Sequence, residues 1–543
     1  MSLRAALVAA AFLLFGCAGV LGVYLGVMSQ AELLRPSVPT DAPGGAPHRS
    51  VMALDSARAP TAAPSRADAP QPPPVAQAGG VVGLGTDQPP ATQDQAIAPP
   101  VAQPSDTASV APTQAPAPAV PPTAPAQDSQ ATAEPPPTVV ALNHQPQQPA
   151  KTEDAPNKRA ITILQLGDSH TSADFLTGEI RRRLQETYGN GGSGYVTAGQ
   201  PHIGVLSSTL KIAVSPGWTY KALQRSEDVG EFWMSGFNTV AAAAGETLTF
   251  SSERPETFDV IEIEAIRRPD GGAIDIRLDG ALEGSFDLAG GKVEPIVIRL
   301  VPDRGPTNRV REITLTTRNE GVVSISSIAI FNTRAGLTYN SVGYPGATID
   351  LLNKLDGRLF ASDLRRLNPQ IVVLSFGTNE ASKANLDIAA YTEKYRRVIG
   401  KIRAALPAAA IVMIGPPEAE ELPSQCKDKA RENATCRRPS ETTASASSGA
   451  DRCEWKTLPR LADVREAQRK IAQRDGLVYW NWASIMPKEC GADRWLTQSP
   501  ALMAKDHVHF TIAGYKKSAA SFLTTLVPVI EKMRSRPDAV SNN

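Results

Sequence analysis

The sequence predicts an α/β protein whose parallel sheet is interrupted by an all-β module. Continuous apolar runs alternate with amphipathic segments on both sides of residues 204–336, as in buried parallel strands and the helices that cover them. Within 204–336, short segments of alternating apolar and polar residues are separated by Gly, Asp, Pro and Asn, which predicts a β sandwich or jelly roll. The module is therefore expected to be inserted into an α/β domain made of residues 159–203 and 337–535.

The first α/β part contains one predicted strand and one predicted helix. The apolar run 161–166 stops at Gly167, and the amphipathic pattern 173–188 ends at Gly189. Open α/β sheets bind ligands at the carboxyl ends of their strands. We therefore expect the turn that follows Gly167 to lie at the functional edge of the sheet.

The second α/β part repeats this pattern several times. Its expected strands are residues 371–376, 410–414 and 477–480, and its expected helices are residues 388–406, 461–474 and 512–533. Residues 418–455 are polar and are interpreted as a long surface loop.

Length and charge limit the function classes without selecting one. The 543 residues include 55 Lys plus Arg and 55 Asp plus Glu, so no net charge attracts the chain to nucleic acid. A nucleic-acid partner is not expected.

The N-terminus indicates export. Residues 5–28 carry no charge, and about 24 uncharged residues exceed the core of a cleavable signal peptide and can span a bilayer. We interpret residues 1–28 as an uncleaved signal anchor. With Arg4 before the span and Glu32 after it, the body is expected on the periplasmic face of the inner membrane. An alternative is lipidation at Cys17, which would give the same exported location.

Residues 29–158 are dominated by Pro, Ala, Gln, Thr and Ser and have too little apolar surface to form a core. They are predicted to be a disordered linker of about 130 residues, with a coil dimension of roughly 60 Å. Such a tether suits a cell-wall substrate, and a passive spacer is an equally open interpretation. Residues 536–543 are assigned to a C-terminal tail.

Four cysteines gather in the last part of the chain: Cys426, Cys436, Cys453 and Cys490. In an oxidising compartment this pattern predicts two disulfides, with all three possible connectivities left open. A zinc site is the alternative, but no C-x-x-C pair is present and the histidines lie elsewhere. No metal is expected.

Three residues could form a nucleophilic site. A serine hydroxyl becomes a nucleophile when a positioned base removes its proton, and the base needs a third group to hold its tautomer. On a helical turn, Asp506 and His509 would share one side, while His507 would point elsewhere. His509 is therefore the expected base for Ser169, oriented by Asp506. The alternative is that Asp506 only caps a surface helix.

A tetrahedral intermediate also needs hydrogen-bond donors for its oxyanion. Gly346 lies in a segment whose backbone can approach closely, and Asn379 follows a buried strand and carries a side-chain amide. Both are expected at strand ends. Taken singly, Gly346 could be a turn glycine and Asn379 a helix cap.

Together these segments resemble the four sequence blocks of the SGNH (GDSL-like) hydrolases. Residues 167–171, the segment around Gly346, residues 377–380 and residues 506–509 match the blocks in order. The resemblance covers about residues 160–200 and 337–533 and implies a flavodoxin-like parallel sheet flanked by helices.

The resemblance implies a role for each residue. Ser169 is the nucleophile and first oxyanion donor, Gly346 the second donor through its N–H, and Asn379 the third. His509 is the base and Asp506 orients it. No cofactor is implied.

The sequence departs from the usual family pattern at the third block, where Glu380 replaces Asp. No G-x-S-x-G elbow surrounds Ser169, which argues against an ordinary α/β-hydrolase.

A narrower resemblance comes from the G-D-S-H-T form of the first block together with the inserted β module. Both are similar to the bacterial peptidoglycan O-acetylesterases, whose module resembles a carbohydrate-binding domain. This implies an O-acetylated glycan as substrate. Trp218, Tyr220 and Trp233 could stack on sugar rings, although aromatic residues in a small sandwich more often belong to its core.

Three other functions remain open at this point. An SGNH acetyltransferase that acetylates an exopolysaccharide would use the same catalytic groups. A non-catalytic wall-binding protein could retain the scaffold, and a lipase would need an acyl groove that the sequence does not reveal.

Overall fold

The computed structural model describes residues 138–142 and 160–535, apart from 228, 302–308, 333–335, 424–425, 427–433 and 437–452. The predicted anchor (1–28), most of the predicted linker (29–158) and the tail (536–543) lie outside the described residues. Among the helices of the described part, none is both long and apolar enough to cross a bilayer.

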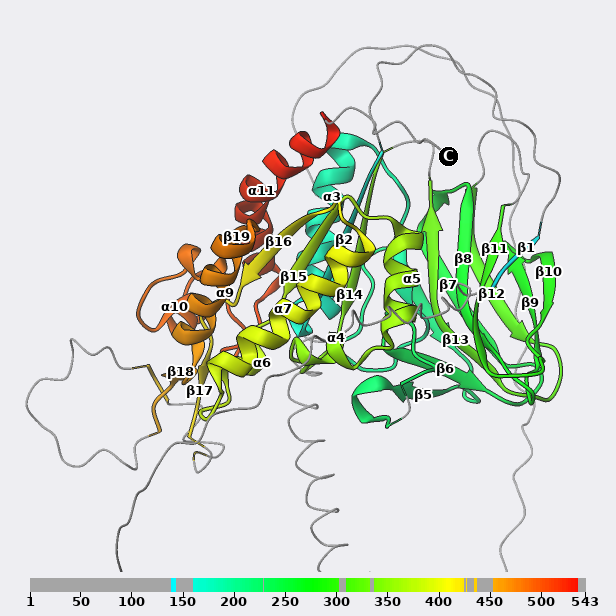
Figure 1. The fold of residues 1–543 in the computed structure, drawn as a ribbon, viewed down its shortest axis with the longest axis horizontal. Helices are drawn as coiled ribbons and strands as arrows, with labels where there is room; N and C mark the ends of the chain where they lie inside the picture. The colour runs from blue at the N-terminus through cyan, green and yellow to red at the C-terminus, as the bar shows by residue number, and fades with distance from the viewer. Residues whose placement is uncertain are drawn as a thin grey trace, which may run out of the picture. The chain divides into compact units, whose positions relative to one another are not determined.

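The α/β part is built on a parallel five-stranded sheet with the strand order β14-β2-β15-β16-β19 (Figure 1). The strands are β2 (Ile161–Gly167), β14 (Leu337–Gly343), β15 (Ile371–Ser375), β16 (Ala410–Gly415) and β19 (Val478–Asn481). All residues of β15 are buried, as are all but one of β2. This burial explains the continuous apolar runs and confirms the predicted parallel sheet.

Helices cover both faces of this sheet. The long helices are α3 (Phe175–Tyr188), α5 (Gly357–Leu367), α7 (Ile388–Ala405), α9 (Leu461–Asp475) and α11 (Ile512–Arg534). Apolar side chains of α3 and α11 pack with one set of strand residues, and those of α5, α7 and α9 pack with the other. The result is a three-layer arrangement with two separate cores.

Short helices follow the strands at their carboxyl ends. They are α2 (Ser169–Ser172), α4 (Asp350–Lys354), α6 (Thr378–Ala381), η4 (Trp482–Ile485) and α10 (Gly491–Leu496). In Figure 1, α4 and α6 lie along the lower edge of the α/β part. Two of these helices carry predicted site residues, Ser169 in α2 and Asn379 in α6.

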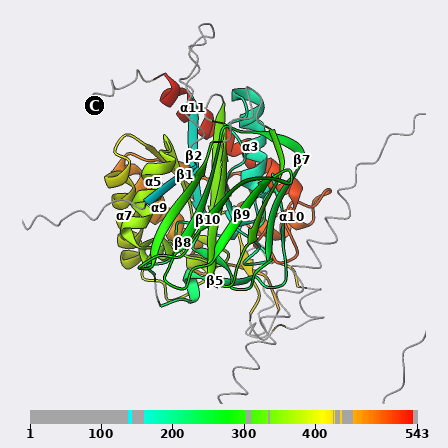
Figure 2. The ribbon, with the colours of Figure 1, turned by 90° about the vertical axis from the view of Figure 1, so that its right-hand side faces the viewer.

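The inserted module consists of two sheets packed face to face, seen in Figure 2 with β8, β9 and β10 labelled. One sheet has the order β1-β11-β8-β13-β6-β5, with β3 also paired to β13, and the other has the order β10-β9-β12-β7-β4. Their bounds are β1 (Thr138–Leu142), β3 (Gly194–Thr197), β4 (Lys211–Val214), β5 (Thr219–Ala222), β6 (Phe237–Ala241), β7 (Thr247–Thr257), β8 (Val260–Arg267), β9 (Ala273–Leu278), β10 (Ala281–Asp287), β11 (Glu294–Leu300), β12 (Arg309–Thr317) and β13 (Val323–Phe331). A 3-10 turn, η1 (Leu223–Arg225), follows β5.

Two boundaries of the module differ from the prediction. Strand β3 precedes the expected start at residue 204, yet it pairs antiparallel with β13. Strand β1 lies inside the predicted disordered linker, where it pairs parallel with β11. Its apolar sequence, TVVAL, is compatible with an edge strand, and β11 offers the unpaired backbone groups. The linker prediction was therefore wrong for residues 138–142.

One disulfide lies within the predicted loop 418–455, and a second joins this loop to Cys490. They join Cys426 to Cys453 and Cys436 to Cys490, which settles the connectivity that the sequence left open. A short antiparallel pair, β17 (Glu420–Glu421) with β18 (Lys456–Thr457), closes the base of this segment. In the described residues, no group of His, Cys, Asp or Glu side chains could hold a metal ion.

A buried cluster of charges joins the module to the α/β part. Arg366 of α5 forms ion pairs with Glu262 and Glu264 of β8 and with Asp363, and its own side chain is 13% exposed. The Tyr195 hydroxyl donates a hydrogen bond of 2.6 Å to Glu264. Burying so many charges is tolerated only because each carboxylate has a partner.

We predict that Arg366→Met lowers the free energy of unfolding by about 3–5 kcal/mol, because the substitution leaves buried carboxylates unpaired. The measurement is urea denaturation followed by tryptophan fluorescence. Arg396→Met is the matched control, since Arg396 forms an ion pair with Glu393 in which both side chains are about half exposed. Equal denaturation midpoints for the two variants would contradict the prediction.

Candidate active site

The turn after β2 presents Ser169 at the edge of the sheet. Strand β2 ends at Gly167, Asp168 caps α2 by accepting a hydrogen bond of 3.0 Å from the His170 N–H, and Ser169 is the first residue of α2. A Cβ atom at Gly167 would lie 2.7 Å from the Ser375 carbonyl oxygen. Glycine is therefore required here, because β15 approaches the turn too closely for any side chain.

His509 and Asp506 complete a hydrogen-bonded chain to this serine. The His509 Nε2 atom lies 2.9 Å from the Ser169 Oγ atom, and the His509 Nδ1 atom lies 2.6 Å from the Asp506 Oδ2 atom. The structure thus brings together side chains from opposite ends of the α/β part. The proton on Nδ1 faces the carboxylate, which leaves Nε2 to accept the serine proton.

The segment that carries this pair is a bend, not the helical turn that the sequence predicted. The Asp506 Oδ1 atom accepts hydrogen bonds from the N–H groups of Val508 (3.0 Å) and His509 (2.9 Å). His507 adopts a positive φ of 58°. The aspartate therefore organises the bend with one oxygen and the imidazole with the other.

His507 points away from Ser169. Its ring lies 3.6 Å from the Trp455 ring in a stacked arrangement, and its Nδ1 atom lies 2.8 Å from a Glu420 carboxylate oxygen. These contacts compensate for the unfavourable backbone conformation of a non-glycine residue. His507 has a structural role, and it connects the bend to the disulfide-bonded segment.

The electrostatics of the chain favour proton uptake by His509. Burial lowers its pKa, but the hydrogen bond and the charge of Asp506 outweigh burial and raise the pKa above 6.5. For Asp506, burial acts in the opposite direction and raises the pKa. The hydrogen bonds and the charge of His509 outweigh burial and hold the pKa of Asp506 below its usual range. The two groups therefore stabilise the imidazolium and carboxylate forms of each other.

The two predicted oxyanion donors lie beside this chain of hydrogen bonds. In register, Gly343 of β14 and Ser375 of β15 both stand opposite Gly167 of β2, so the three strands end at the same level. Gly346 and Asn379 follow β14 and β15 by three and four residues, respectively. Ser169, Gly346 and Asn379 thus belong to turns at the ends of three neighbouring strands.

Hydrogen bonds connect the two donor segments. The Asn379 Nδ2 group donates to the Ala347 carbonyl oxygen at 2.9 Å, which leaves its second hydrogen free. Gly346 is exposed and has a positive φ of 71°, which favours glycine. In the described part of the chain, the N–H groups of Gly346 and Ser169 donate to no other atom.

Glu380 also connects α6 to the segment that follows Gly346. Its Oε1 atom accepts a hydrogen bond of 2.8 Å from the Ile349 N–H, and burial raises the pKa of the carboxyl to about 7. Burial also raises the pKa of Asp168 to about 7. The glutamate that replaces the usual aspartate of this block therefore holds the Gly346 turn against α6.

Sequence reasoning missed the buried residues that contact His170, the neighbour of Ser169. His170 is fully buried, and its Nδ1 atom lies 3.0 Å from the Tyr515 hydroxyl. Burial lowers the pKa of this imidazole to about 3, so it remains neutral. The rings of Trp482 and Phe510 surround it. No local signal identifies Tyr515, because it lies 345 positions away from His170.

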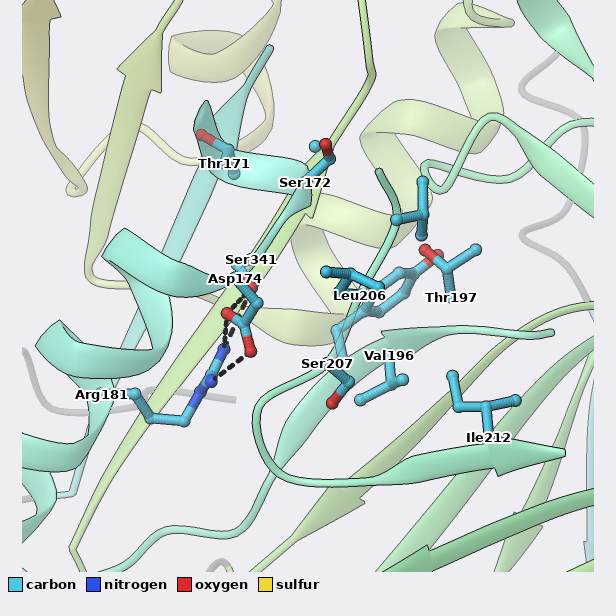
Figure 3. A pocket seen from close by; sticks show the side chains of 13 residues that line it. Thr171, Ser172, Asp174, Arg181, Val196, Thr197, Leu206, Ser207, Ile212 and Ser341 are labelled. Atoms are coloured by element: carbon cyan, nitrogen blue, oxygen red, sulfur yellow. Dashed lines mark hydrogen bonds and ion pairs between the residues drawn. The ribbon is translucent and has the colours of Figure 1, made fainter. Parts of the chain in front are cut away.

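A buried ion pair fixes the connection between α2 and α3. Arg181 donates to Asp174 at 3.0 Å, and both side chains are about 95% buried (Figure 3). The Ser172 hydroxyl donates to the Gly204 carbonyl oxygen at 2.7 Å, and the Ser208 N–H donates to Asp174. The segment that enters the module is therefore attached directly to the helix that carries Ser169.

Only one of the three aromatic residues proposed for sugar stacking is exposed. Trp218 is 6% exposed and Trp233 is fully buried, so both belong to the core. Tyr220 is 37% exposed.

Residues 329–517 match the GDSL-like Lipase/Acylhydrolase family. The match includes Gly346, Asn379, Asp506 and His509, whereas Ser169 precedes the matched range. Residues 329–517 are therefore similar to a GDSL-like acylhydrolase domain, and such domains belong to the class of carboxylic ester hydrolases. No curated protein matches the sequence.

A solved structure of a peptidoglycan O-acetylesterase is similar to this chain. It is 24% identical, with a TM-score of 0.53, and the similarity covers 69% of this chain and 92% of the other. Family two carbohydrate esterases from Clostridium thermocellum (11% identity, TM-score 0.24, 59% and 99% coverage) and Cellvibrio japonicus (14%, 0.22, 63% and 97%) are more distant. The first of these similarities confirms the expected fold.

We predict that a fluorophosphonate probe labels Ser169 and that His509→Gln slows labelling by roughly 10²-fold or more, because the variant lacks the general base. His507→Gln is the matched control and should label much faster than His509→Gln, since His507 points away from Ser169 and glutamine can still bond to Glu420. The measurement is the labelling rate of folded protein, checked by circular dichroism. Equal rates for the two variants would show that His509 is not the base.

Proposed function

We propose that this protein removes O-acetyl groups from a cell-envelope glycan, with peptidoglycan as the polymer, through an acetyl-Ser169 intermediate. The observation that carries the proposal is the hydrogen-bonded chain from Asp506 through His509 to Ser169. An imidazole so oriented can deprotonate the hydroxyl during attack on an ester carbonyl.

In the first step, the Ser169 Oγ atom attacks the acetyl carbonyl carbon while its proton moves to the His509 Nε2 atom. The carbonyl oxygen becomes an oxyanion, which would receive hydrogen bonds from the free N–H groups of Ser169 and Gly346 and from the second amide hydrogen of Asn379. Each such donor contributes about 3–4 kcal/mol to lowering the barrier. The intermediate then collapses as its bond to the sugar oxygen breaks, and His509 gives its proton to that oxygen, which leaves as a sugar hydroxyl.

In the second step, water attacks the acetyl-serine ester. His509 takes one proton from the water, and the second tetrahedral intermediate uses the same donors. Its collapse releases acetate and returns the proton to the Ser169 oxygen. The raised pKa of His509 supports both steps, because the imidazolium that forms in each is stabilised by Asp506.

Two observations support a wall glycan as substrate. The similar solved structure is that of a peptidoglycan O-acetylesterase. The module is attached to the α2 helix through Ser172, so it would lie beside a polymer bound at Ser169.

The two disulfides support an exported location, because such bonds persist in oxidising compartments. We propose the periplasmic face of the inner membrane, with residues 1–28 as the anchor and the residues that follow as a tether. A processed form released freely into the medium would contradict this location.

The direct test is release of acetate from O-acetylated peptidoglycan. We expect the unmodified protein to release acetate and Ser169→Ala to fall to the background rate, since no acyl-enzyme can form. Acetate is measured enzymatically after the polymer is removed. Undiminished release by Ser169→Ala would overturn the mechanism. Acetyl transfer onto an added glycan acceptor, in place of acetate release, would identify a transferase.

We further predict that Asp506→Asn moves the acidic limb of the kcat/KM profile to lower pH. His509 acts as a base only above its pKa, and Asp506 raises that pKa. Removing the carboxylate leaves burial as the main influence, and burial lowers the pKa of an imidazole. The same variant should lower kcat by roughly 10²-fold or more, because the tautomer is no longer held. A limb that stays in place would show that another group sets the profile. The measurement is p-nitrophenyl acetate hydrolysis between pH 4.5 and pH 9, values chosen to bracket roughly the ordinary range of histidine.

A further inference from the structure

The inserted module reaches the turn that carries Gly346. The Gln224 side chain in η1 donates a hydrogen bond of 3.1 Å to the Pro345 carbonyl oxygen. From the other side, a Cβ atom placed on Gly204 would lie 3.7 Å from Pro345 and 3.3 Å from the ring of His202. Two segments of the module therefore lie against the residue that precedes the proposed oxyanion donor.

These two segments carry a cation and a hydrogen-bond donor. Arg225 follows Gln224, is exposed, and forms no ion pair in the part of the chain that the structure describes. His202 is half-buried, and burial, together with the nearby charge of Arg225, lowers the pKa of its imidazole. Its Nδ1 atom accepts a hydrogen bond of 2.9 Å from the Gly204 N–H. The neutral ring therefore presents its Nε2–H group as a donor.

A second cation comes from the α/β part. Lys354, the last residue of α4, donates a hydrogen bond of 2.7 Å to the carbonyl oxygen of Ser226, the residue after Arg225. Figure 1 shows β5, which η1 follows, on the same lower side as α4. Lys354 therefore reaches, from a different part of the fold, the segment that carries Arg225.

Several other arginines of the module are paired with carboxylates. Arg267 pairs with Glu294, and both Arg277 and Arg318 pair with Asp275. Arginine and lysine side chains that form no ion pair among the described residues suit an anionic ligand, and the guanidinium group matches a carboxylate in a bidentate manner.

We propose that Arg225, His202 and Lys354 form a subsite that binds a carboxylate of the glycan substrate next to the acetyl group that is removed. This inference rests on the proposed function and narrows its substrate class to anionic, carboxylate-bearing glycans. In peptidoglycan, the O-acetylated sugar also carries a lactyl group, whose carboxyl is joined to the stem peptide by an amide bond. The carboxylates of the intact polymer are therefore those of the stem peptide, and a lactyl carboxylate exists only where the peptide has been removed. A neutral acetylated polysaccharide has no group for this subsite.

The test compares substrates in the full-length protein. Arg225→Gln should raise the KM for O-acetylated peptidoglycan roughly three- to fivefold more than it changes the KM for p-nitrophenyl acetate, because one partly exposed charge pair is lost. Arg225→Lys should recover part of the loss. Added salt should weaken the preference of the unmodified protein for the polymer and should affect Arg225→Gln less.

Arg311→Gln is the matched control. Arg311 is an exposed arginine of the same module, on β12 in the other sheet, and no ion pair involves its side chain in the described residues. The control removes the same charge from a residue outside the proposed subsite. It should therefore leave both KM values and the salt dependence unchanged.

Two further arms separate the sources of the carboxylate. Amidase treatment hydrolyses the amide bond between the lactyl group and the stem peptide, which removes the peptide and creates a lactyl carboxylate. A difference that appears or grows after treatment therefore assigns the subsite to the lactyl group. A difference that disappears assigns it to the peptide carboxylates.

The outcomes that overturn the inference are distinct from those that overturn the function. If the unmodified protein hydrolyses p-nitrophenyl acetate but releases no acetate from peptidoglycan, the proposed function and this inference both fail. If peptidoglycan is deacetylated and Arg225→Gln behaves like Arg311→Gln, only the subsite fails. Equal losses on polymer and small ester, without a change in salt dependence, would give Arg225 a structural role and also overturn the subsite.

Discussion

The site depends on the common register at which three parallel strands end. Gly343, Gly167 and Ser375 stand side by side in β14, β2 and β15, so the turns that follow them emerge at one level. The 2.9 Å contact between Ser169 and His509 requires this level, because a shift of one residue in β2 would move the serine by about 3.3 Å and reverse the faces of its strand. The close approach of the Ser375 carbonyl to Gly167 makes such a shift sterically costly.

Much of this arrangement could be predicted from the sequence, because its signals are local. The apolar run before Gly167 predicts a buried strand and the position of Ser169 at its end. The identities and order of Gly346, Asn379, Asp506 and His509 indicate the remaining groups once they are compared with a known family. The structure brings Ser169, Asp506 and His509 into hydrogen-bond contact and connects the Asn379 amide to the Gly346 turn.

The features that could not be predicted depend on contacts between distant residues. Asp506 and His509 occupy a bend and not a helical turn, since stacking on Trp455 and the contact with Glu420 hold His507 at a positive φ. The support of His170 by Tyr515 has no local signature. Strand β1 pairs with β11, which offers a free sheet edge. This edge exists only in the folded sheet, so the composition of residues 138–142 does not reveal the pairing.

The position of the insertion has a consequence for how the chain reaches its native state. Strands β2 and β14 are neighbours in the sheet, yet all of the module except β1 lies between them in sequence. Joining the ends of so long a segment is entropically unfavourable while it is unfolded, and formation of β3 beside β13 brings those ends together. We therefore expect the pairing of β3 with β13 to favour the pairing of β2 with β14 during folding. Excising the module would remove the paired strands that bring the ends of β2 and β14 together.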